Sequence, residues 1–326
     1  MRIQPDLYHG EQSSDRFFEG WYFKLTTGDG RSFAFIPGVG KGHDPHSFLQ
    51  IINGPKSEYH YLRFPIGAFH SSHERLEVGV GANRFSLSAL KADVKEAGIK
   101  ADLRFTNISR WPDSRLAPGS MGVFNHLSFL ECYNQVCALD GRVEGTFTID
   151  GKHVDLTDAR IYVEKNWGRS FPKAWFWAQC NRFDDKRAAF TCSIGEVPIG
   201  GMSFRGIVSG LMLDGAFYPF TTMNGTAFRL SPRPGGMDLV MANSHARVKC
   251  EFTDGERFVL CKAPNNGEMC SRAPETLTAS MVLSLSVPDD GGWHTIYQGT
   301  SSCCGIEYGG QWERKAIRAN ARSRRQ

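Results

Sequence analysis

The chain has 326 residues, of which 41% are hydrophobic, so it can build a folded core and is not globally disordered. It has no run of about 18 apolar residues, which excludes a membrane-spanning helix from the prediction. The net charge of +4 comes from one end: residues 314–326 hold six basic side chains and no acidic one, and the remaining chain has a net charge of −2, which argues against a nucleic-acid-binding surface.

We expect the tail, residues 314–326, to be disordered, with a weak peripheral contact to anionic lipid as the alternative. The first residues lack the apolar segment of a secretory signal. Nine cysteines, an odd number without CxxC spacing, predict small buried thiols in a reducing compartment. These features favour a cytoplasmic protein, with contact to a membrane surface left open.

The first distinctive element is an aromatic stretch at residues 17–24, in which Glu19 stands among phenylalanine, tryptophan and tyrosine. A second stretch, residues 162–181, contains Glu164, and the two stretches hold four of the seven tryptophans. A carboxyl group surrounded by rings is costly to ionise, so it can stay a neutral proton donor near pH 7. The rings can also stabilise a transient cation. This combination suits acid-catalysed chemistry on an alkene.

A purely structural interpretation of the two stretches remains open at this point. Aromatic residues at alternate strand positions often fill the inside of a barrel. Glu164 is followed directly by Lys165 and could be half of an ion pair.

Outside the aromatic stretches, the sequence supports no motif for a cofactor, a metal or a nucleophile. The glycine-rich residues 38–42 lack the spacing of a phosphate loop, and no GxGxxG fingerprint occurs. His43 and His46 are spaced like metal ligands, but they lie on a loop broken by Pro45. Ser120 and Ser203 lack the G-x-S-x-G elbow. We therefore predict no cofactor and no metal.

Six Asp-Gly pairs divide the chain, at residues 29–30, 140–141, 150–151, 214–215, 254–255 and 290–291. Asp-Gly supplies the positive φ angles of tight hairpin turns. Residues 142–150 alternate between apolar and polar, and residues 85–105 fit a hairpin better than a helix. The pattern predicts an all-β, antiparallel fold built as barrels or sandwiches.

A weak internal repeat predicts two domains. Trp21-Tyr22-Phe23 is followed by an apolar strand at residues 33–35, and Trp175-Phe176-Trp177 is followed in the same way by residues 189–191. Each half ends with a strand that carries a glutamate, at residues 161–164 and 305–307. We predict domains at residues 1–170 and 171–313, followed by the tail at 314–326.

In three motifs the chain resembles the tocopherol cyclase family. They are FEGWYF at residues 18–23, EKNWG with FP and WFWAQCN at residues 164–181, and GIEYGG at residues 305–310, before Trp312. The likeness runs from about residue 8 to residue 312. The resemblance implies kinship with paired lipocalin-like barrels that include carotenoid hydratases. The expected fold is therefore two antiparallel lipocalin-like β-barrels in tandem.

The resemblance also implies a chemistry that needs no cofactor. Protonation of the alkene of a prenylated hydroquinone gives a tertiary cation, and the phenol oxygen then closes a chromanol ring. We expect Glu164 or Glu19 to give the proton. The residues expected to line the substrate site are Trp21, Tyr22, Tyr162, Trp167, Trp175, Trp177, Gln179 and Asn181.

Two other functions remain open for the same residues. A non-catalytic carrier would hold a quinone or isoprenoid in the cavity without converting it. A hydratase would let water instead of the phenol capture the cation. In each case the expected partner is a small lipophilic molecule, and the sequence predicts no oligomeric state.

Overall fold

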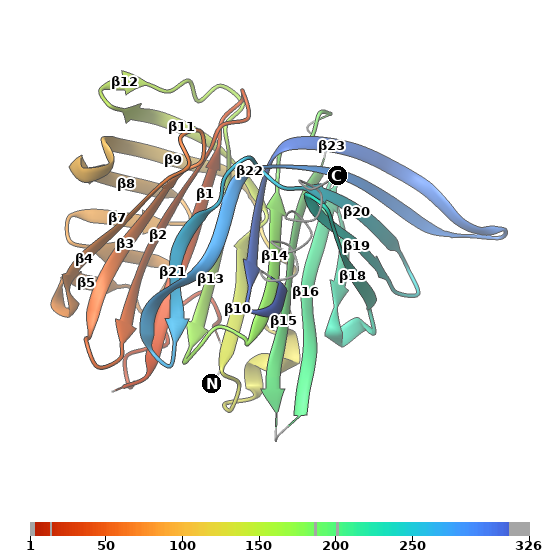
Figure 1. Ribbon diagram of the computed structural model, residues 1–326, viewed down its shortest axis with the longest axis horizontal. Helices are drawn as coiled ribbons and strands as arrows, with labels where there is room; N and C mark the ends of the chain where they lie inside the picture. The colour runs from red at the N-terminus through yellow and green to blue at the C-terminus, as the bar shows by residue number, and fades with distance from the viewer. Residues whose placement is uncertain (1–3, 14, 186–187, 200–201, 313–326) are drawn as a thin grey trace. The chain divides into compact units, whose positions relative to one another are not determined.

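The computed structural model describes residues 4–13, 15–185, 188–199 and 202–312 (Figure 1). In this part of the chain the fold is all-β, as predicted, and every strand pair is antiparallel. The helical structure here consists of residues 311–312 and four short 3-10 turns, which are η1 (Ile66–Ala68), η2 (Lys95–Ala97), η3 (Gly122–His126) and η4 (Thr222–Asn224). No helix among these residues is long and apolar enough to cross a bilayer. The predicted basic tail lies outside the described residues.

The first sheet has 13 strands in the order β4-β3-β2-β1-β13-β11-β9-β8-β7-β6-β5, with β10 added on β13 and β12 on β11. Because β6 also lies close to β2 and β3, the sheet curls into a nearly closed barrel. Its strands are β1 (Phe17–Thr26), β2 (Ser32–Lys41), β3 (His46–Asn53), β4 (Glu58–Pro65), β5 (Phe69–Ser71), β6 (Glu77–Val80), β7 (Asn83–Ser86), β8 (Ala89–Val94), β9 (Ile99–Ser109), β10 (Cys132–Ala138), β11 (Asp140–Ile149), β12 (Lys152–His153) and β13 (Arg160–Gly168).

The core of the first barrel is formed by alternate residues of its central strands. Trp21 and Phe23 of β1 and Ile161 and Val163 of β13 belong to it. Since side chains alternate along a strand, the residues between them face the other side of the sheet. We call these two sides the inner and outer faces. Tyr22, on the outer face, is also buried, so hydrophobicity does not alternate along these strands.

The second sheet has 10 strands in the order β17-β16-β15-β14-β23-β22-β20-β19-β18, with β21 paired to β22. Its core contains every second residue of β14, from Ala174 to Cys180. Its strands are β14 (Ala174–Cys180), β15 (Ala188–Ile199), β16 (Met202–Leu213), β17 (Ala216–Thr221), β18 (Ala227–Arg233), β19 (Gly236–Ala242), β20 (Arg247–Thr253), β21 (Val259–Asn265), β22 (Glu268–Asp289) and β23 (Gly292–Gly309).

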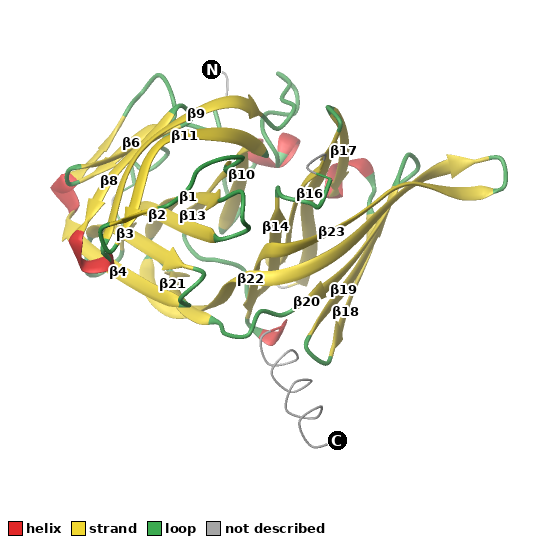
Figure 2. Cartoon of the chain, turned by 90° about the horizontal axis from the view of Figure 1, so that it is seen from above, coloured by secondary structure: helices red, strands yellow, loops and turns green. Residues whose placement is uncertain are grey.

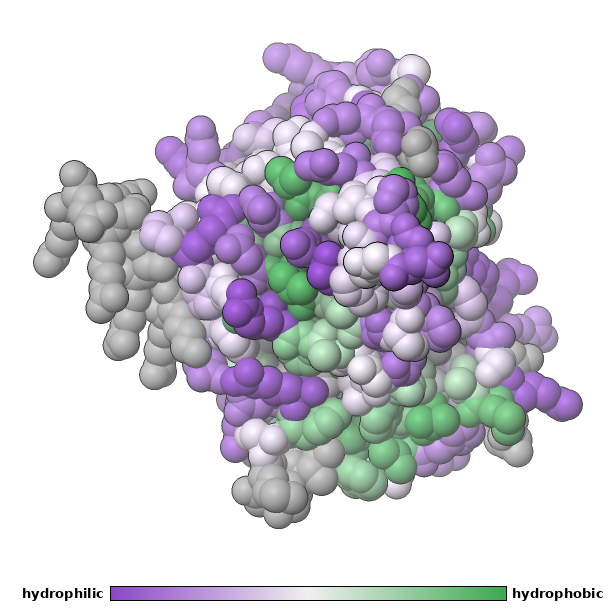
Figure 3. All heavy atoms as spheres, turned by 90° about the vertical axis from the view of Figure 1, so that its right-hand side faces the viewer, coloured by the Kyte–Doolittle hydropathy of each residue, from purple (hydrophilic) through white to green (hydrophobic). Residues whose placement is uncertain are grey.

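The contacts within the chain divide it into two compact units. The first unit comprises residues 1–171 and 261–271, and the second comprises residues 172–260 and 272–326. The prediction placed residues 261–271 in the second domain, whereas these contacts group them with the first unit. In the second unit, β22 and β23 continue as a hairpin past the other strands of their sheet (Figure 2). The face shown in Figure 3 is largely hydrophilic, with apolar side chains gathered towards its lower edge.

Four of the six Asp-Gly pairs lie in hairpin turns, as predicted, at residues 29–30, 150–151, 214–215 and 290–291. The other two predictions are wrong. Asp140 and Gly141 lie inside β11, where the register against β9 shifts in a β-bulge. Asp254 and Gly255 follow β20, which pairs with β19 and β22, so they begin a loop and not a hairpin.

The predicted hairpin within residues 85–105 is confirmed: β8 and β9 pair and are joined through η2. Gly98 ends η2 in the left-handed region at φ 62°. Seven of the nine cysteines are buried, as predicted for small buried thiols, while Cys270 is exposed.

Candidate functional site

The inner face of the first barrel carries a buried ion pair where the two aromatic stretches meet. β1 and β13 pair with Trp21 opposite Lys165 and Glu19 opposite Trp167. The side chains of Glu19 and Lys165 form an ion pair, and both are 0% exposed. The main-chain N–H of His9 donates to Glu19 Oε2 over 2.8 Å. Glu19 therefore has a resident cationic partner.

The Lys165 ammonium lies among three polar groups of the first unit. They are the Glu19 carboxylate, the Leu7 carbonyl oxygen and, at 3.2 Å, His9 Nδ1, which accepts from Lys165 in the tautomer that carries its proton on Nε2. Its Nζ atom also lies 5.1 Å from the ring centroid of Trp21 and 4.7 Å from that of Trp167. Two of the rings predicted to stabilise a substrate cation thus hold a lysine ammonium.

His9 completes this inner cluster from the segment before β1. Its ring stacks on Trp167 with centroids 4.3 Å apart and planes 4° from parallel. Tyr133 of β10 also stacks on Trp167, at 5.1 Å. Burial lowers the pKa of His9 below its ordinary value, and the contact of its Nδ1 atom with Glu19 Oε1, at 3.3 Å, opposes this effect. A neutral His9 ring can accept the hydrogen bond from Lys165.

Glu164 lies on the outer face of the same barrel wall. The residue is 4% exposed, with the Tyr162 hydroxyl donating to Oε2 over 2.6 Å and the Asn166 amide donating to Oε1 over 3.2 Å. The Asn134 amide in turn donates to Asn166 Oδ1 over 3.2 Å. Tyr22 is directly opposite Glu164 in the ladder and therefore shares its face. Polar hydrogen atoms thus point at a buried carboxyl group.

The second unit presents its own aromatic face. Trp175, Trp177 and Gln179 alternate with the core residues of β14 and so lie on the side away from the core of their sheet. Opposite them in β23 are Gly309, Glu307 and Gly305. The Trp175 indole N–H donates to Glu307 Oε1, and the guanidinium of Arg272 lies 5.1 Å from the Trp175 ring centroid. Asn181, 2% exposed, directly follows the end of β14.

The predicted residues thus fall on distinct surfaces. Glu19, Trp21 and Trp167 share the inner face of the first barrel. Tyr22, Tyr162 and Glu164 share its outer face, so the structure does not bring the two candidate carboxyls together.

Sequence reasoning missed two members of the inner cluster. His9 gave no signal of its own. Lys165 stood out only beside Glu164, but the pleat turns the two side chains to opposite faces, and Lys165 pairs with Glu19 instead.

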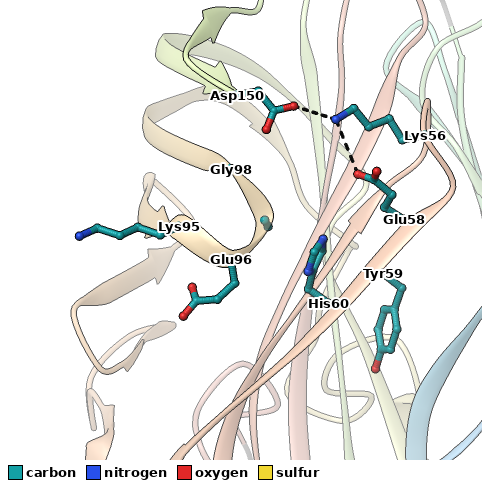
Figure 4. A pocket seen from close by; sticks show the side chains of 9 residues that line it. Lys56, Glu58, Tyr59, His60, Lys95, Glu96, Gly98 and Asp150 are labelled. Carbon is teal, nitrogen blue, oxygen red and sulfur yellow. Dashed lines mark hydrogen bonds and ion pairs between the residues drawn. The ribbon is translucent and has the colours of Figure 1, made fainter.

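A further hollow, of about 410 Å³, lies on the first unit near Lys56 (Figure 4). The Lys56 ammonium is 2.7 Å from an Asp150 carboxylate oxygen and 3.8 Å from one of Glu58. None of the residues predicted to be functional lines it. Because mostly polar and charged side chains line it, this hollow suits a lipophilic substrate poorly.

Two antiparallel sheets, one curled into a nearly closed barrel and each with buried carboxyl and indole groups, define a lipocalin-like all-β protein. The solved structure of CghA has a similar fold, with a TM-score of 0.63 and 9% identity over 95% of this chain and 93% of that chain. The structure of CghA with Sch210972 gives a TM-score of 0.58 and 10% identity over 90% of this chain and 88% of that chain.

Sequence comparison identifies the family. The tocopherol cyclase-like family model matches residues 90–310. A probable chloroplastic tocopherol cyclase of Oryza sativa subsp. japonica is 30% identical over 371 residues, covering 95% of this chain and 79% of the rice protein. The chloroplastic tocopherol cyclase of Zea mays is 27% identical over 196 residues, covering 56% of this chain and 40% of the maize protein. The chain belongs to the tocopherol cyclase-like family, as the resemblance predicted.

Proposed function

We propose that this protein is a cofactor-independent isoprenoid cyclase and that Glu164 gives the proton that starts closure of a chromanol ring on a prenylated hydroquinone. Family membership supports the substrate class. The observation that carries the proposal is the setting of Glu164, a residue 4% exposed whose carboxyl group accepts hydrogen bonds from the neutral donors Tyr162 and Asn166.

The contacts of Glu19 favour Glu164 as the donor. Both oxygens of Glu19 are engaged, Oε1 by Lys165 and Oε2 by the His9 N–H. A proton on Glu19 would weaken its attraction to a buried ammonium and leave that charge poorly compensated. In this proposal, Glu19 fixes the N-terminal segment to the barrel and does not take part in the reaction.

The surroundings of Glu164 suit both halves of an acid–base cycle. Burial favours the neutral acid before reaction, and the two donors stabilise the carboxylate that remains after the proton has left. The proton adds to the less substituted alkene carbon and leaves a tertiary cation. The phenol oxygen attacks this cation, and its proton returns to Glu164 directly or through the Tyr162 hydroxyl. The reaction is an isomerisation, and the enzyme ends as it began.

Tyr22 is the neighbour best placed to contact the substrate near the acid. It is directly opposite Glu164 in the antiparallel ladder, on the same face, and its side chain is 8% exposed. An electron-rich ring next to the point of protonation can stabilise a developing cation by about 0.5–2 kcal/mol.

The test is incubation of the purified protein with a prenylated hydroquinone, followed by product mass analysis. We expect a product of unchanged mass, with turnover reduced at least about 100-fold in Glu164→Gln, since a positioned acid contributes about 10²–10⁴. Tyr162→Phe is expected to slow turnover by a smaller factor. Glutamine fits the same space as glutamate and keeps an acceptor for Tyr162, so lost activity would reflect the lost proton.

Other outcomes would replace the proposal. Full activity in Glu164→Gln together with loss in Glu19→Gln would transfer the role to Glu19. Tight binding of the hydroquinone without conversion would make the protein a carrier. A product heavier by one water would make it a hydratase.

A further inference from the structure

The second unit contains a buried side-chain amide that the described part of the chain leaves without a hydrogen bond. Gln179 of β14 is 0% exposed. Neither its Nε2 nor its Oε1 atom has a hydrogen-bond partner among the described residues. Buried polar side chains are nearly always hydrogen-bonded, and an amide with both ends unmet is rare.

The strand register places one side chain and one bare glycine beside Gln179. Its neighbour in β23 is Gly305, which has no side chain, and its neighbour in β15 is Thr191, whose hydroxyl is not hydrogen-bonded to the amide. The Trp177 ring lies over Gly305, since a Cβ atom placed there would be only 2.9 Å from that ring. On the Gly305 side, the neighbour of the amide is therefore an aromatic ring, which offers no conventional acceptor on its face.

The first unit fills the corresponding position differently. Glu164 of β13 is opposite Tyr22, and Glu307 of β23 is opposite Trp177, which makes Lys24 of β1 the counterpart of Gln179. Lys24 is opposite Tyr162, a large side chain, where Gln179 is opposite glycine.

Gln179 also does not belong to the packing of the second core. The core takes the alternate residues Phe176, Ala178 and Cys180 of β14. Gln179 lies on the opposite side with Trp177, whose ring supplies an aromatic surface next to the amide. The polar Gln179 amide thus lies next to the flat apolar surface of the Trp177 ring.

We propose that Gln179 and the Trp177 ring form a binding site of the second unit for a neutral ring that carries a hydroxyl group. An amide offers N–H donors and a carbonyl acceptor side by side, and a hydroxyl both donates and accepts. A carboxylate would leave the carbonyl unmet, and an ammonium would leave the N–H groups unmet. The ligand ring stacks on the indole. This inference concerns binding alone and does not depend on which carboxyl donates a proton.

The test compares binding of 2,3,5-trimethylhydroquinone and of its dimethyl ether by titration calorimetry without oxygen. The ether keeps the ring but cannot donate, and neither probe carries an alkene, so turnover does not enter. We expect the wild-type protein to bind the hydroquinone about tenfold or more tightly than the ether. In Gln179→Leu the preference should disappear.

The matched control is Gln135→Leu, which removes a buried amide that is satisfied. Gln135 accepts from the Ser120 N–H over 2.9 Å and donates to Asp6 over 2.9 Å. We expect Gln135→Leu to lower the urea midpoint of unfolding, while Gln179→Leu leaves it unchanged or raises it. A midpoint lowered as much in Gln179→Leu would overturn the inference, because the amide would then be paired in the free protein. Absence of hydroquinone binding, or a preference that survives Gln179→Leu, would overturn it as well.

Discussion

Replacing Lys165 by methionine tests the inner cluster of the first barrel most directly. Methionine keeps most of the length of lysine and removes the charge. Since both members of the pair are 0% exposed, the substitution leaves the Glu19 carboxylate buried without its counter-ion. Removing one partner of a buried ion pair costs about 3–5 kcal/mol. A folded domain has only about 5–15 kcal/mol of stability, so a large part of it would be lost.

Urea unfolding of four proteins measures this cost: wild type, Lys165→Met, Glu19→Gln and the double variant. In the wild type, the main-chain N–H of His9 donates to Glu19 Oε2 over 2.8 Å, and glutamine at position 19 keeps an acceptor for it. The double variant has no buried charge at this pair, so we expect it to be more stable than Lys165→Met alone. The reasoning would be refuted if Lys165→Met cost less than about 1 kcal/mol, as for an exposed ion pair, or if the double variant cost the sum of the two single changes.

Two further changes test the surroundings of the candidate sites. Burial lowers the pKa of His9 in the folded protein, so below about pH 6.5 the unfolded chain binds more protons, and stability should fall as the pH falls through that range. In His9→Gln, urea unfolding measured at several pH values should show a shallower fall of stability. An unchanged slope would contradict the role assigned to His9. A Cβ atom at Gly309 would overlap the Trp175 ring, so Gly309→Ala should lower the free energy of unfolding by about 1–3 kcal/mol. Gly291→Ala is the control, because no atom lies within 4 Å of a Cβ placed there, and it should change stability little. Equal urea midpoints of unfolding for the two variants would contradict the packing argument.

The sequence was most informative about the fold where local chemistry decides the structure. Asp-Gly pairs mark turns because few other residues accept positive φ at so little cost, and Asp150 and Asp214 do so at 51° and 47°. The same dipeptide at residues 140–141 misled because it sits in a β-bulge, and a bulge depends on the register of the neighbouring strand. Pairing between distant strands leaves no such local mark.

The candidate site was harder to predict because both faces of its strands are buried. In β1, Trp21 and Tyr22 are 0% and 8% exposed although they point to opposite sides of the sheet. Because neither face of the strand is polar, the sequence does not show which of these aromatic residues share a face. The ion pair of Glu19 with Lys165 joins residues 146 positions apart, which no spacing rule detects. His9 adds a third segment that only the folded chain brings near.

The pairing of strands also changes how the internal repeat should be aligned. Matching tryptophan with tryptophan places Trp21 on Trp175, but Trp21 faces the core of its barrel and Trp175 faces away from the core of its sheet. Matching the two glutamates by their partners places Tyr22 on Trp177 instead. That shift of one residue puts Trp21 on Phe176, and both face a core. A one-residue shift exchanges the two faces of a strand. The two units therefore repeat the order of their strands, but their tryptophans occupy different environments.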